Sequence, residues 1–211
     1  MRRRLLLAAL AAAALPALAQ HDQRRFEDAE RWSKVFDDPS RDAWQKPAEV
    51  IRALGLAPQA AVADLGSGTG YFAVRLARAL PAGRVYGADL EPDMVRFLEQ
   101  RAAKEGLVNL SSHLAAADDP RLPVAVDLVL VVDTYHHIAA RVGYFGRLRA
   151  SLKPGGRVAI IDFGPDSPAG PPARHRVARE RVLEEMGRAG YALAAAHDFL
   201  PYQYFLVFQP R

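Results

Sequence analysis

Short apolar runs alternate with helix-like segments from Ala61 to the end of the chain, and this alternation restricts the fold more than any other feature. Strand-like runs occupy 61–65, 84–90, 110–117, 126–135, 157–163, 192–200 and 203–210. Helix-like segments occupy 71–80, 92–106, 139–152 and 175–190. All residues of the run VDLVLVV except one aspartate are apolar, so both faces of this strand are apolar. That is expected of a strand covered by helices on both sides. The sequence predicts a doubly wound α/β domain with a seven-stranded, mostly parallel sheet, preceded by a helical extension.

The N-terminus has the three parts of a secretory leader. Arg2, Arg3 and Arg4 precede 15 apolar residues, Leu5 to Ala19, that end in Ala-Leu-Ala. A spanning helix needs roughly 20 residues, whereas a signal peptide needs fewer. We expect a signal peptide over 1–19, a helical extension or lid over 20–58, and the main domain over 59–211. The expected location is then the periplasm. An uncleaved anchor and a mis-assigned start codon, which would leave the protein cytoplasmic, are the alternatives.

Composition narrows the classes of partner. The 211 residues are 50% hydrophobic and 25% charged, which suits one globular domain. The chain has 28 Lys and Arg against 24 Asp and Glu, so removing the three leader arginines lowers the net charge from +4 to +1. A nearly neutral domain is a poor nucleic-acid binder, and we expect none, nor stable membrane insertion after cleavage. The absence of cysteine excludes disulfides and thiolate chemistry.

A glycine-rich loop, VADLGSGTGYF, follows the first strand. Glycine tolerates positive φ and lets a ligand approach the main chain, and ligands of such sheets bind at the carboxyl ends of the strands. A dinucleotide fingerprint would need its third glycine at position 71, which is Tyr71, and no Walker lysine follows. The acidic Asp64 suits a cationic ligand better than a pyrophosphate. Asp89, at the next strand's end, can accept hydrogen bonds from ribose hydroxyls. Together they indicate a nucleoside with a cationic tail.

Four motifs resemble the class I S-adenosylmethionine-dependent methyltransferases, in that family's order and spacing. They are VADLGSGTGYF, VYGADLEPDM, DLVLVVDTYHHI and LKPGGRVAIIDF, and the resemblance covers about residues 46 to 211. It implies a Rossmann-like fold, S-adenosyl-L-methionine as cofactor, and a small-molecule acceptor, since small-molecule enzymes of quinone biosynthesis are the most similar. The chain has DTYH after the fourth strand, where nucleic-acid methyltransferases carry Asn/Asp-Pro-Pro-Tyr/Phe.

The resemblance also implies roles for individual residues. Cofactor contacts would come from Asp64, Gly66, Gly68, Gly70, Tyr71, Asp89, Asp118 and Asp133, with Ala117 supplying backbone. In this set Asp89 would hold the ribose and Asp118 the adenine amino group. Asp118 also belongs to an ordinary Asp-Asp-Pro turn, and aspartate is common where strands end in turns.

The segment Asp133-Thr134-Tyr135-His136-His137 is the candidate catalytic region. Methyl transfer needs alignment, and a base only where the acceptor must lose a proton. His136 or His137 could be that base, with Tyr135 as a wall or donor, while Asp133 would face the reactive end. Alternatively both histidines only cap the next helix. We expect no metal, because adjacent side chains on a strand point to opposite faces.

Two further segments flank the expected site. Arg41, Trp44 and Gln45 could form a lid over the cofactor, or Trp44 could simply pack on the core. A Pro/Gly-rich loop beside Asp162, His175 and Arg176 could shape the acceptor pocket. The arginines of 175–190 should form a solvated face paired with Glu180, Glu184 and Glu185.

Export and S-adenosylmethionine conflict, because that cofactor is made in the cytosol. Two functions therefore follow from the sequence. The first is S-adenosylmethionine-dependent methyl transfer to a small molecule. The alternative is a non-catalytic exported protein that keeps the fold and binds a nucleoside-like ligand, since fold alone does not prove activity.

Overall fold

The computed structural model describes residues 26–211, so the predicted signal peptide over 1–19 lies outside the described residues. One seven-stranded sheet has the order β3-β2-β1-β4-β5-β7-β6. Its strands are β1 (Ala61–Leu65), β2 (Arg84–Asp89), β3 (Leu110–Leu114), β4 (Val126–Val132), β5 (Leu152–Phe163), β6 (Tyr191–His197) and β7 (Gln203–Pro210). The first five pair in parallel, whereas β7 runs antiparallel to both β5 and β6. The predicted mostly parallel sheet is confirmed.

Residues 26–211 form seven helices and three short 3₁₀ turns, of which the first three helices precede β1. The helices are α1 (Ala29–Phe36), α2 (Arg41–Gln45), α3 (Pro47–Ala53), α4 (Tyr71–Ala79), α5 (Pro92–Lys104), α6 (Arg141–Leu148) and α7 (Arg179–Arg188). The 3₁₀ turns are η1 (Tyr135–His137), η2 (Arg149–Ser151) and η3 (Ala173–His175). Prolines at the first positions of α3 and α5 suit the fixed φ that a helix start requires.

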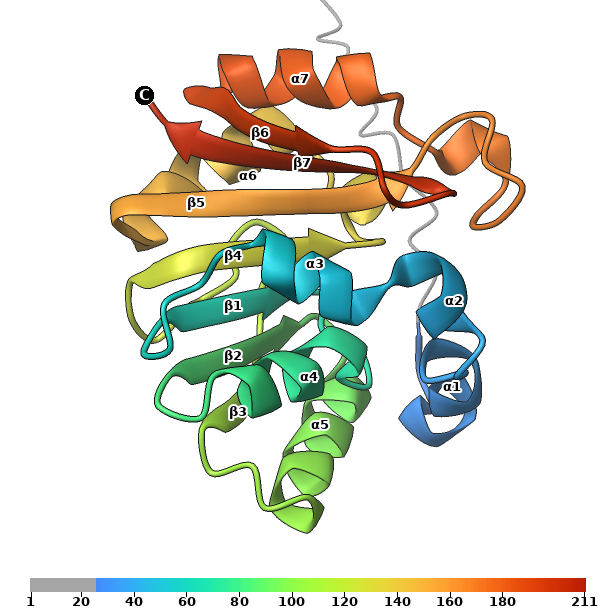
Figure 1. The fold of residues 1–211 in the computed structure, drawn as a ribbon, viewed down its shortest axis with the longest axis vertical. Helices are drawn as coiled ribbons and strands as arrows, with labels where there is room; N and C mark the ends of the chain where they lie inside the picture. Colours follow the sequence, from blue (N-terminus) through green and yellow to red (C-terminus); the bar gives the residue numbers. More distant parts are fainter. Residues whose placement is uncertain (1–25) are drawn as a thin grey trace, which may run out of the picture.

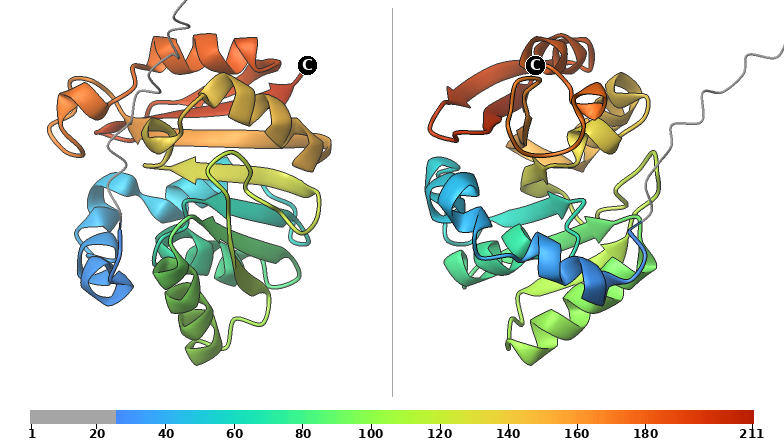
Figure 2. Two further views of the ribbon diagram at one scale, coloured as in Figure 1. Left: turned by 180° about the vertical axis from the view of Figure 1, so that it is seen from behind. Right: turned by 90° about the vertical axis from the view of Figure 1, so that its right-hand side faces the viewer.

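Two apolar cores lie on the two faces of the sheet. On one face Leu128 and Leu130 of β4 pack with side chains of α3, α4 and α5. On the other face Val129 and Val131 pack with side chains of α6 and α7. Figures 1 and 2 show the resulting three layers. Successive side chains of a strand point to opposite faces of the sheet. A central strand such as β4, with apolar residues at both odd and even positions, therefore contributes side chains to both cores.

The N-terminal helices lie across one edge of the sheet. In Figure 1, α1 and α2 are on the right, at the end where the parallel strands finish. Because β7 is antiparallel to β5, its first residue, Gln203, pairs with Phe163 at the last position of β5. The same edge therefore contains the carboxyl ends of six strands, β1 to β6, together with the amino end of β7 and helices α1 and α2.

Helix α7 differs from its prediction at both its start and its polar face. It begins at Arg179 rather than near His175, because the Pro/Gly-rich loop continues into η3. Arg181 and Arg188 do pair with Glu184. Arg181 also pairs with Glu185 (2.8 Å), as predicted. Glu185 is nevertheless buried instead of solvated, and it accepts hydrogen bonds from the Tyr135 hydroxyl (2.8 Å) and from Arg141 Nε (2.6 Å).

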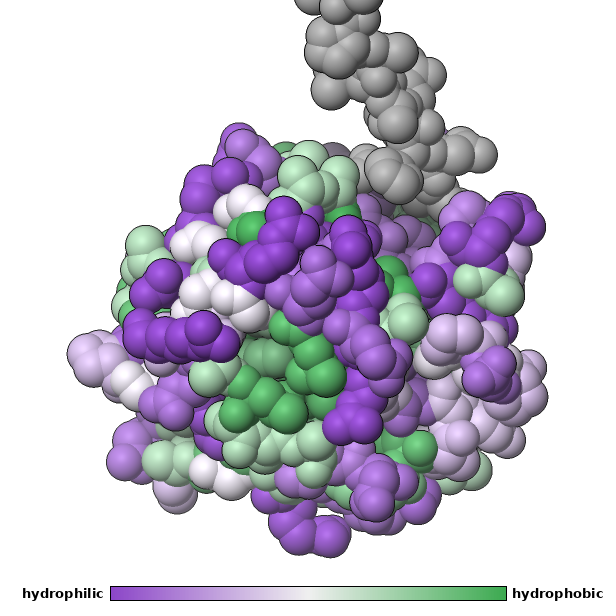
Figure 3. All heavy atoms as spheres, turned by 90° about the horizontal axis from the view of Figure 1, so that it is seen from above, coloured by the Kyte–Doolittle hydropathy of each residue, from purple (hydrophilic) through white to green (hydrophobic). Residues whose placement is uncertain are grey.

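The edge strand β6 exposes apolar side chains. Leu193 is 45% exposed, and its neighbours Ala192, Ala194 and Ala196 are also exposed. Figure 3 looks onto this end of the molecule and shows an apolar patch among hydrophilic residues. Across residues 26–211, no helix has both the length and the apolar character that crossing a membrane would require.

Candidate active site

The glycine-rich loop joins β1 to α4 at the carboxyl edge. Gly66, Gly68 and Gly70 all have positive φ, of 71°, 51° and 95°. A Cβ at Gly66 would overlap the Thr134 side chain, and one at Gly70 would overlap Leu98. These two glycines are therefore required by the packing of the protein itself as well as by backbone conformation. At Gly68 the nearest side chain is Phe36, the last residue of α1.

Two aspartates support this loop from the ends of β1 and β2. Asp64 is 3% exposed, and burial raises its pKa from the ordinary 3.8 to about 7, with a smaller contribution from Asp89. The Ala73 backbone N–H, in the first turn of α4, acts in the opposite direction. Asp89 accepts hydrogen bonds from the N–H groups of Gly68 (2.8 Å) and Glu91 (3.0 Å). Burial also raises the pKa of Asp89. Uncompensated carboxyl groups at one edge suit a cationic ligand.

Asp133 follows β4 and is held by side chains from distant parts of the chain. Its φ of 53° is unusual for a residue with a side chain. Gln45 donates to Oδ2 (3.1 Å), Arg41 lies 3.4 Å from the same oxygen, and Gln203 donates to Oδ1. Burial, and then the nearby Asp162 carboxylate, raise the pKa of Asp133 to about 6.

His136 lies next to Asp133 and is bound by Asp162. Its Nδ1 is 2.9 Å from both oxygens of Asp162, and its backbone N–H donates to Oδ2 (3.1 Å). The side chains of His136 and Asp162 are 4% and 0% exposed. His137 is exposed, and its ring centroid lies 4.1 Å from that of His136. The structure therefore distinguishes the two candidate bases by burial: the His136 side chain is buried against the Asp162 carboxylate, whereas His137 is exposed.

Two expectations about this segment are wrong. Tyr135 does not line the edge, because its ring is buried in the core between the sheet, α6 and α7, and its hydroxyl binds Glu185. The two histidines do not point to opposite faces, because the chain turns into the 3₁₀ helix η1 directly after β4. Among residues 26–211, no group of three or more His, Cys, Asp or Glu side chains could hold a metal ion.

Helix α2 is attached to the glycine-rich loop through Tyr71. The Tyr71 ring lies between the guanidinium groups of Arg41 (4.1 Å) and Arg75 (4.0 Å). Its hydroxyl donates to Asp42 (2.5 Å), and Asp42 also pairs with Arg75 (2.9 Å). Helix α2 is thereby fixed over the N-terminal end of α4.

The other predicted lid residue, Trp44, is partly buried. Its ring packs against those of Phe163 (5.8 Å), the last residue of β5, and Tyr202 (5.9 Å), directly before β7. Helix α1 adds an aromatic cluster of Phe26, Trp32 and Phe36, in which Phe26 also contacts the His137 ring (5.7 Å). The N-terminal helices thus cover the glycine-rich loop and the histidines together.

The remaining candidates lie further out. The Asp118 carboxylate is 79% exposed and 3.9 Å from Arg147. Arg176 binds carbonyl oxygens of its own Pro/Gly-rich loop, from Gly164 to Pro171, so it orders that loop from within. His175, in η3, is exposed.

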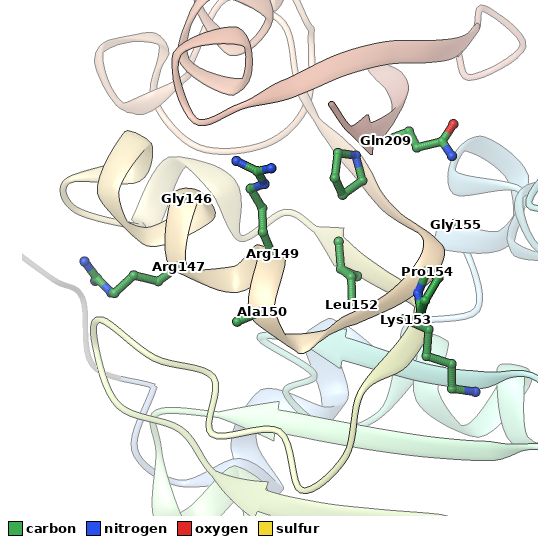
Figure 4. A pocket seen from close by; sticks show the side chains of 10 residues that line it. Gly146, Arg147, Arg149, Ala150, Leu152, Lys153, Pro154, Gly155 and Gln209 are labelled. Carbon is green, nitrogen blue, oxygen red and sulfur yellow. The ribbon is translucent and has the colours of Figure 1, made fainter.

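An open cavity of about 770 Å³ lies at the other edge of the sheet, lined by residues of α6, η2, β5 and β7. Its charged lining residues are Arg147, Arg149 and Lys153, and Figure 4 shows that they point in three different directions. Because their charged heads do not converge, the cavity offers no concentrated anion site.

Gln203 is a site residue that the sequence reasoning did not find. It is a polar residue at the start of the otherwise apolar strand QYFLVFQP, and it is 6% exposed. The antiparallel direction of β7 places Gln203 at the carboxyl edge of the sheet, where its buried side-chain amide needs hydrogen-bond partners. The sequence predicts Gln45 as a lid residue and Asp162 as a neighbour of the acceptor loop, whereas the structure shows that they bind Asp133 and His136.

Comparisons with known proteins agree with this arrangement. Residues 62–156 match the family model described as "Methyltransferase domain". Demethylmenaquinone methyltransferase of Thermus thermophilus is 31% identical over 161 residues, which are 75% of this chain and 71% of the relative. Trans-aconitate 2-methyltransferase of Rhodopseudomonas palustris is 30% identical over 82% of this chain and 63% of the relative. The chain thus spans about two thirds of the length of these relatives.

Solved structures extend the likeness to the whole fold. A SAM-dependent methyltransferase from Aquifex aeolicus has a TM-score of 0.79 and 25% identity, covering 86% of this chain and 97% of that one. Magnesium protoporphyrin IX methyltransferase from Synechocystis, solved with SAH bound, has a TM-score of 0.66 and 19% identity, with 86% and 93% covered.

The chain belongs to the class I S-adenosylmethionine-dependent methyltransferases. It is an enzyme of that class, with S-adenosylmethionine as cofactor. The residues at the carboxyl edge fit this group, because a molecule with a sulfonium and an ammonium would compensate the buried carboxyl groups of Asp64 and Asp133. The alternative of a non-catalytic binding protein finds no support in these comparisons.

Proposed function

We infer that this enzyme methylates a small organic acceptor bound over the ends of β4 and β5, beside Asp133 and His136. The observation that carries this is the grouping, at one edge, of the glycine-rich loop, Asp89, Asp133 and the buried His136. Strand β4, which leads to Asp133 and His136, lies next to β1, which leads to the glycine-rich loop. A cofactor bound at the glycine-rich loop and Asp89 would therefore have Asp133 and His136 near its reactive end.

Each residue has a defined part in this proposal. Asp89 would hold the ribose hydroxyls, and Asp64 would balance positive charge beneath the loop. Gly66, Gly68, Gly70 and Tyr71 would shape the methionine subsite, and Asp118 with Ala117 would lie near the adenine. When bound, S-adenosylmethionine supplies an electrophilic methyl group on sulfur, so this chain has only to align the acceptor, exclude water and receive any released proton.

The names of the relatives suggest two kinds of acceptor. One relative is named for a demethylated menaquinone and another for trans-aconitate, a carboxylic acid. Both are small molecules, and the low net charge of the chain without its leader and the DTYH segment after β4 both argue against a nucleic-acid acceptor. We further propose that the protein acts after export, with residues 1–19 as its leader.

The test is formation of S-adenosylhomocysteine by the purified chain from residue 20 onward. Acceptors should include a reduced demethylated quinone, simple hydroxylated aromatics and trans-aconitate, with calorimetry of cofactor binding in parallel. Turnover with a small acceptor supports the proposal. Cofactor binding without turnover on any of these would contradict it.

A further inference from the structure

The structure contains a carboxylate–imidazole pair at the acceptor side of the site, and its geometry defines the form of the imidazole. A carboxylate can only accept hydrogen bonds. Since Nδ1 of His136 lies 2.9 Å from both oxygens of Asp162, Nδ1 carries the ring proton of the neutral imidazole. Nε2 is then a proton acceptor, and it has no hydrogen-bond partner among residues 26–211.

Asp162 is itself fixed in place by the protein. It is fully buried at the end of β5, and it accepts backbone N–H groups from His136 (3.1 Å) and Phe163 (2.8 Å) as well as the ring N–H. Three donors on one carboxylate allow it little rotation. The pair therefore joins the ends of β4 and β5 rigidly.

We propose that Asp162 is a positioning residue that holds His136 with Nε2 free to take a proton, and that the acceptor is consequently one that must lose a proton, such as a hydroxylated aromatic. This inference rests on the proposed function and narrows its substrate class. An acceptor that is already an anion, such as a carboxylate, has no need of such a pair.

The proton and electron balance of this step is simple. The acceptor's O–H or activated C–H bond breaks, and its proton moves to Nε2 of His136. The electron pair left behind forms the bond to the methyl carbon, while the electrons of the methyl–sulfur bond remain on sulfur. Asp162 then faces an imidazolium and stabilises it, and the proton leaves to solvent after the product departs.

The charged groups around the pair agree with this use. Asp133 lies close enough to His136 for the two to interact, and it is itself bound by Arg41, Gln45 and Gln203. Asp162, whose carboxylate is hydrogen-bonded to the ring, is the direct partner of the imidazole. His137, adjacent in sequence, lies beside His136 in η1, with 4.1 Å between the two ring centroids.

The first measurement is the tautomer of His136. Long-range nitrogen–proton spectra of the labelled full chain distinguish the two ring nitrogens, and the His136→Gln variant assigns the signals. We expect the proton on Nδ1 in the wild type and a changed tautomer equilibrium in Asp162→Asn. A wild-type imidazole with its proton on Nε2 would overturn the proposal.

The second measurement is turnover of phenolic acceptors of graded acidity by Asp162→Asn, with the exposed Asp198→Asn as matched control. We expect kcat to fall by about a hundredfold, within the range of general base catalysis, with cofactor affinity changed less than about twofold. The deficit should shrink as the acceptor becomes more acidic. A deficit that is the same for all acceptors indicates a purely structural role and refutes the proposal, as does unchanged turnover.

Thermal unfolding of Asp162→Asn shows whether the buried site tolerates the isosteric change. If the wild type turns over no acceptor, the proposed function has failed, and the ring-nitrogen spectra alone decide whether Asp162 sets the tautomer.

Discussion

The buried carboxyl group of Asp64 makes stability depend on pH in a direction opposite to that of most aspartates. Asp64 binds its proton more tightly in the folded chain, because burial raises its pKa from 3.8 to about 7. The stabilisation by protonation is complete below the unfolded-state value and is lost as pH rises through about 7. Replacing Asp64 by Asn removes the titration, and the Asn carbonyl can still accept the Ala73 N–H.

The magnitude follows from linkage. At about 1.36 kcal/mol for each tenfold change in proton affinity, these two pKa values imply that the wild type loses roughly 2.5 kcal/mol between about pH 5 and about pH 8. For a chain of this size that corresponds to roughly 5–10 °C in Tm. Asp133, with its pKa raised to about 6, adds a loss in the same direction that both proteins share.

The assay is urea and thermal unfolding of wild type and Asp64→Asn without cofactor, at about pH 5 and about pH 8. We expect the variant to gain on the wild type as pH rises, by roughly 2.5 kcal/mol between the two conditions. Equal differences at both pH values would show that Asp64 ionises normally in the folded protein, and would refute the reasoning.

Three further results are expected. Asp89→Ala should weaken binding of S-adenosylmethionine by about ten- to a thousandfold in calorimetry, because it leaves two ribose hydroxyls and the Gly68 N–H without an acceptor; unchanged affinity would remove the ribose assignment. Gly66→Ala should lower the free energy of unfolding by about 3 kcal/mol or more, against about 1–2 kcal/mol for Gly55→Ala, because both have positive φ but only Gly66 has a side chain in the way; equal losses would contradict the packing with Thr134. Binding of S-adenosylmethionine at about pH 6 should release a proton from Asp64, and binding of S-adenosylhomocysteine should release less because that molecule lacks the sulfonium charge. Calorimetry in two buffers of different ionisation enthalpy measures the number of protons released. Equal release by the two molecules would show that the sulfonium charge does not cause it.

Local patterns were sufficient to predict the sheet and the loop. The alternation of strands and helices, the apolar run of β4 and the glycines at 66, 68 and 70 each depend on neighbours in sequence, and the structure confirms the elements that they predict. The observed ends of elements differ from the predicted ones where a turn follows. Strand β4 ends at Val132 rather than at residue 135, because the chain turns into η1.

Contacts between distant segments could not be predicted in this way. The pairing of His136 with Asp162 spans 26 residues, and that of Gln45 with Gln203 spans 158. Glu185 illustrates the same limit, because its helix period indicated a solvated face, while burial against Tyr135 and Arg141 depends on how α6 and α7 pack. Which carboxylate meets which donor is decided by strand order and direction.

The buried side-chain amide of Gln45 determines how far this protein can be shortened without losing contacts of the site. The matched family range begins at residue 62 and ends at 156, but the neighbours of Asp133 come from α2 and from the first residue of β7. A fragment trimmed to that range would keep the glycine-rich loop and lose every side-chain amide that steadies the strand-four carboxylate. The side chains that hold Asp133 therefore come from Arg41 at one end to Gln203 at the other, and both lie outside the matched range.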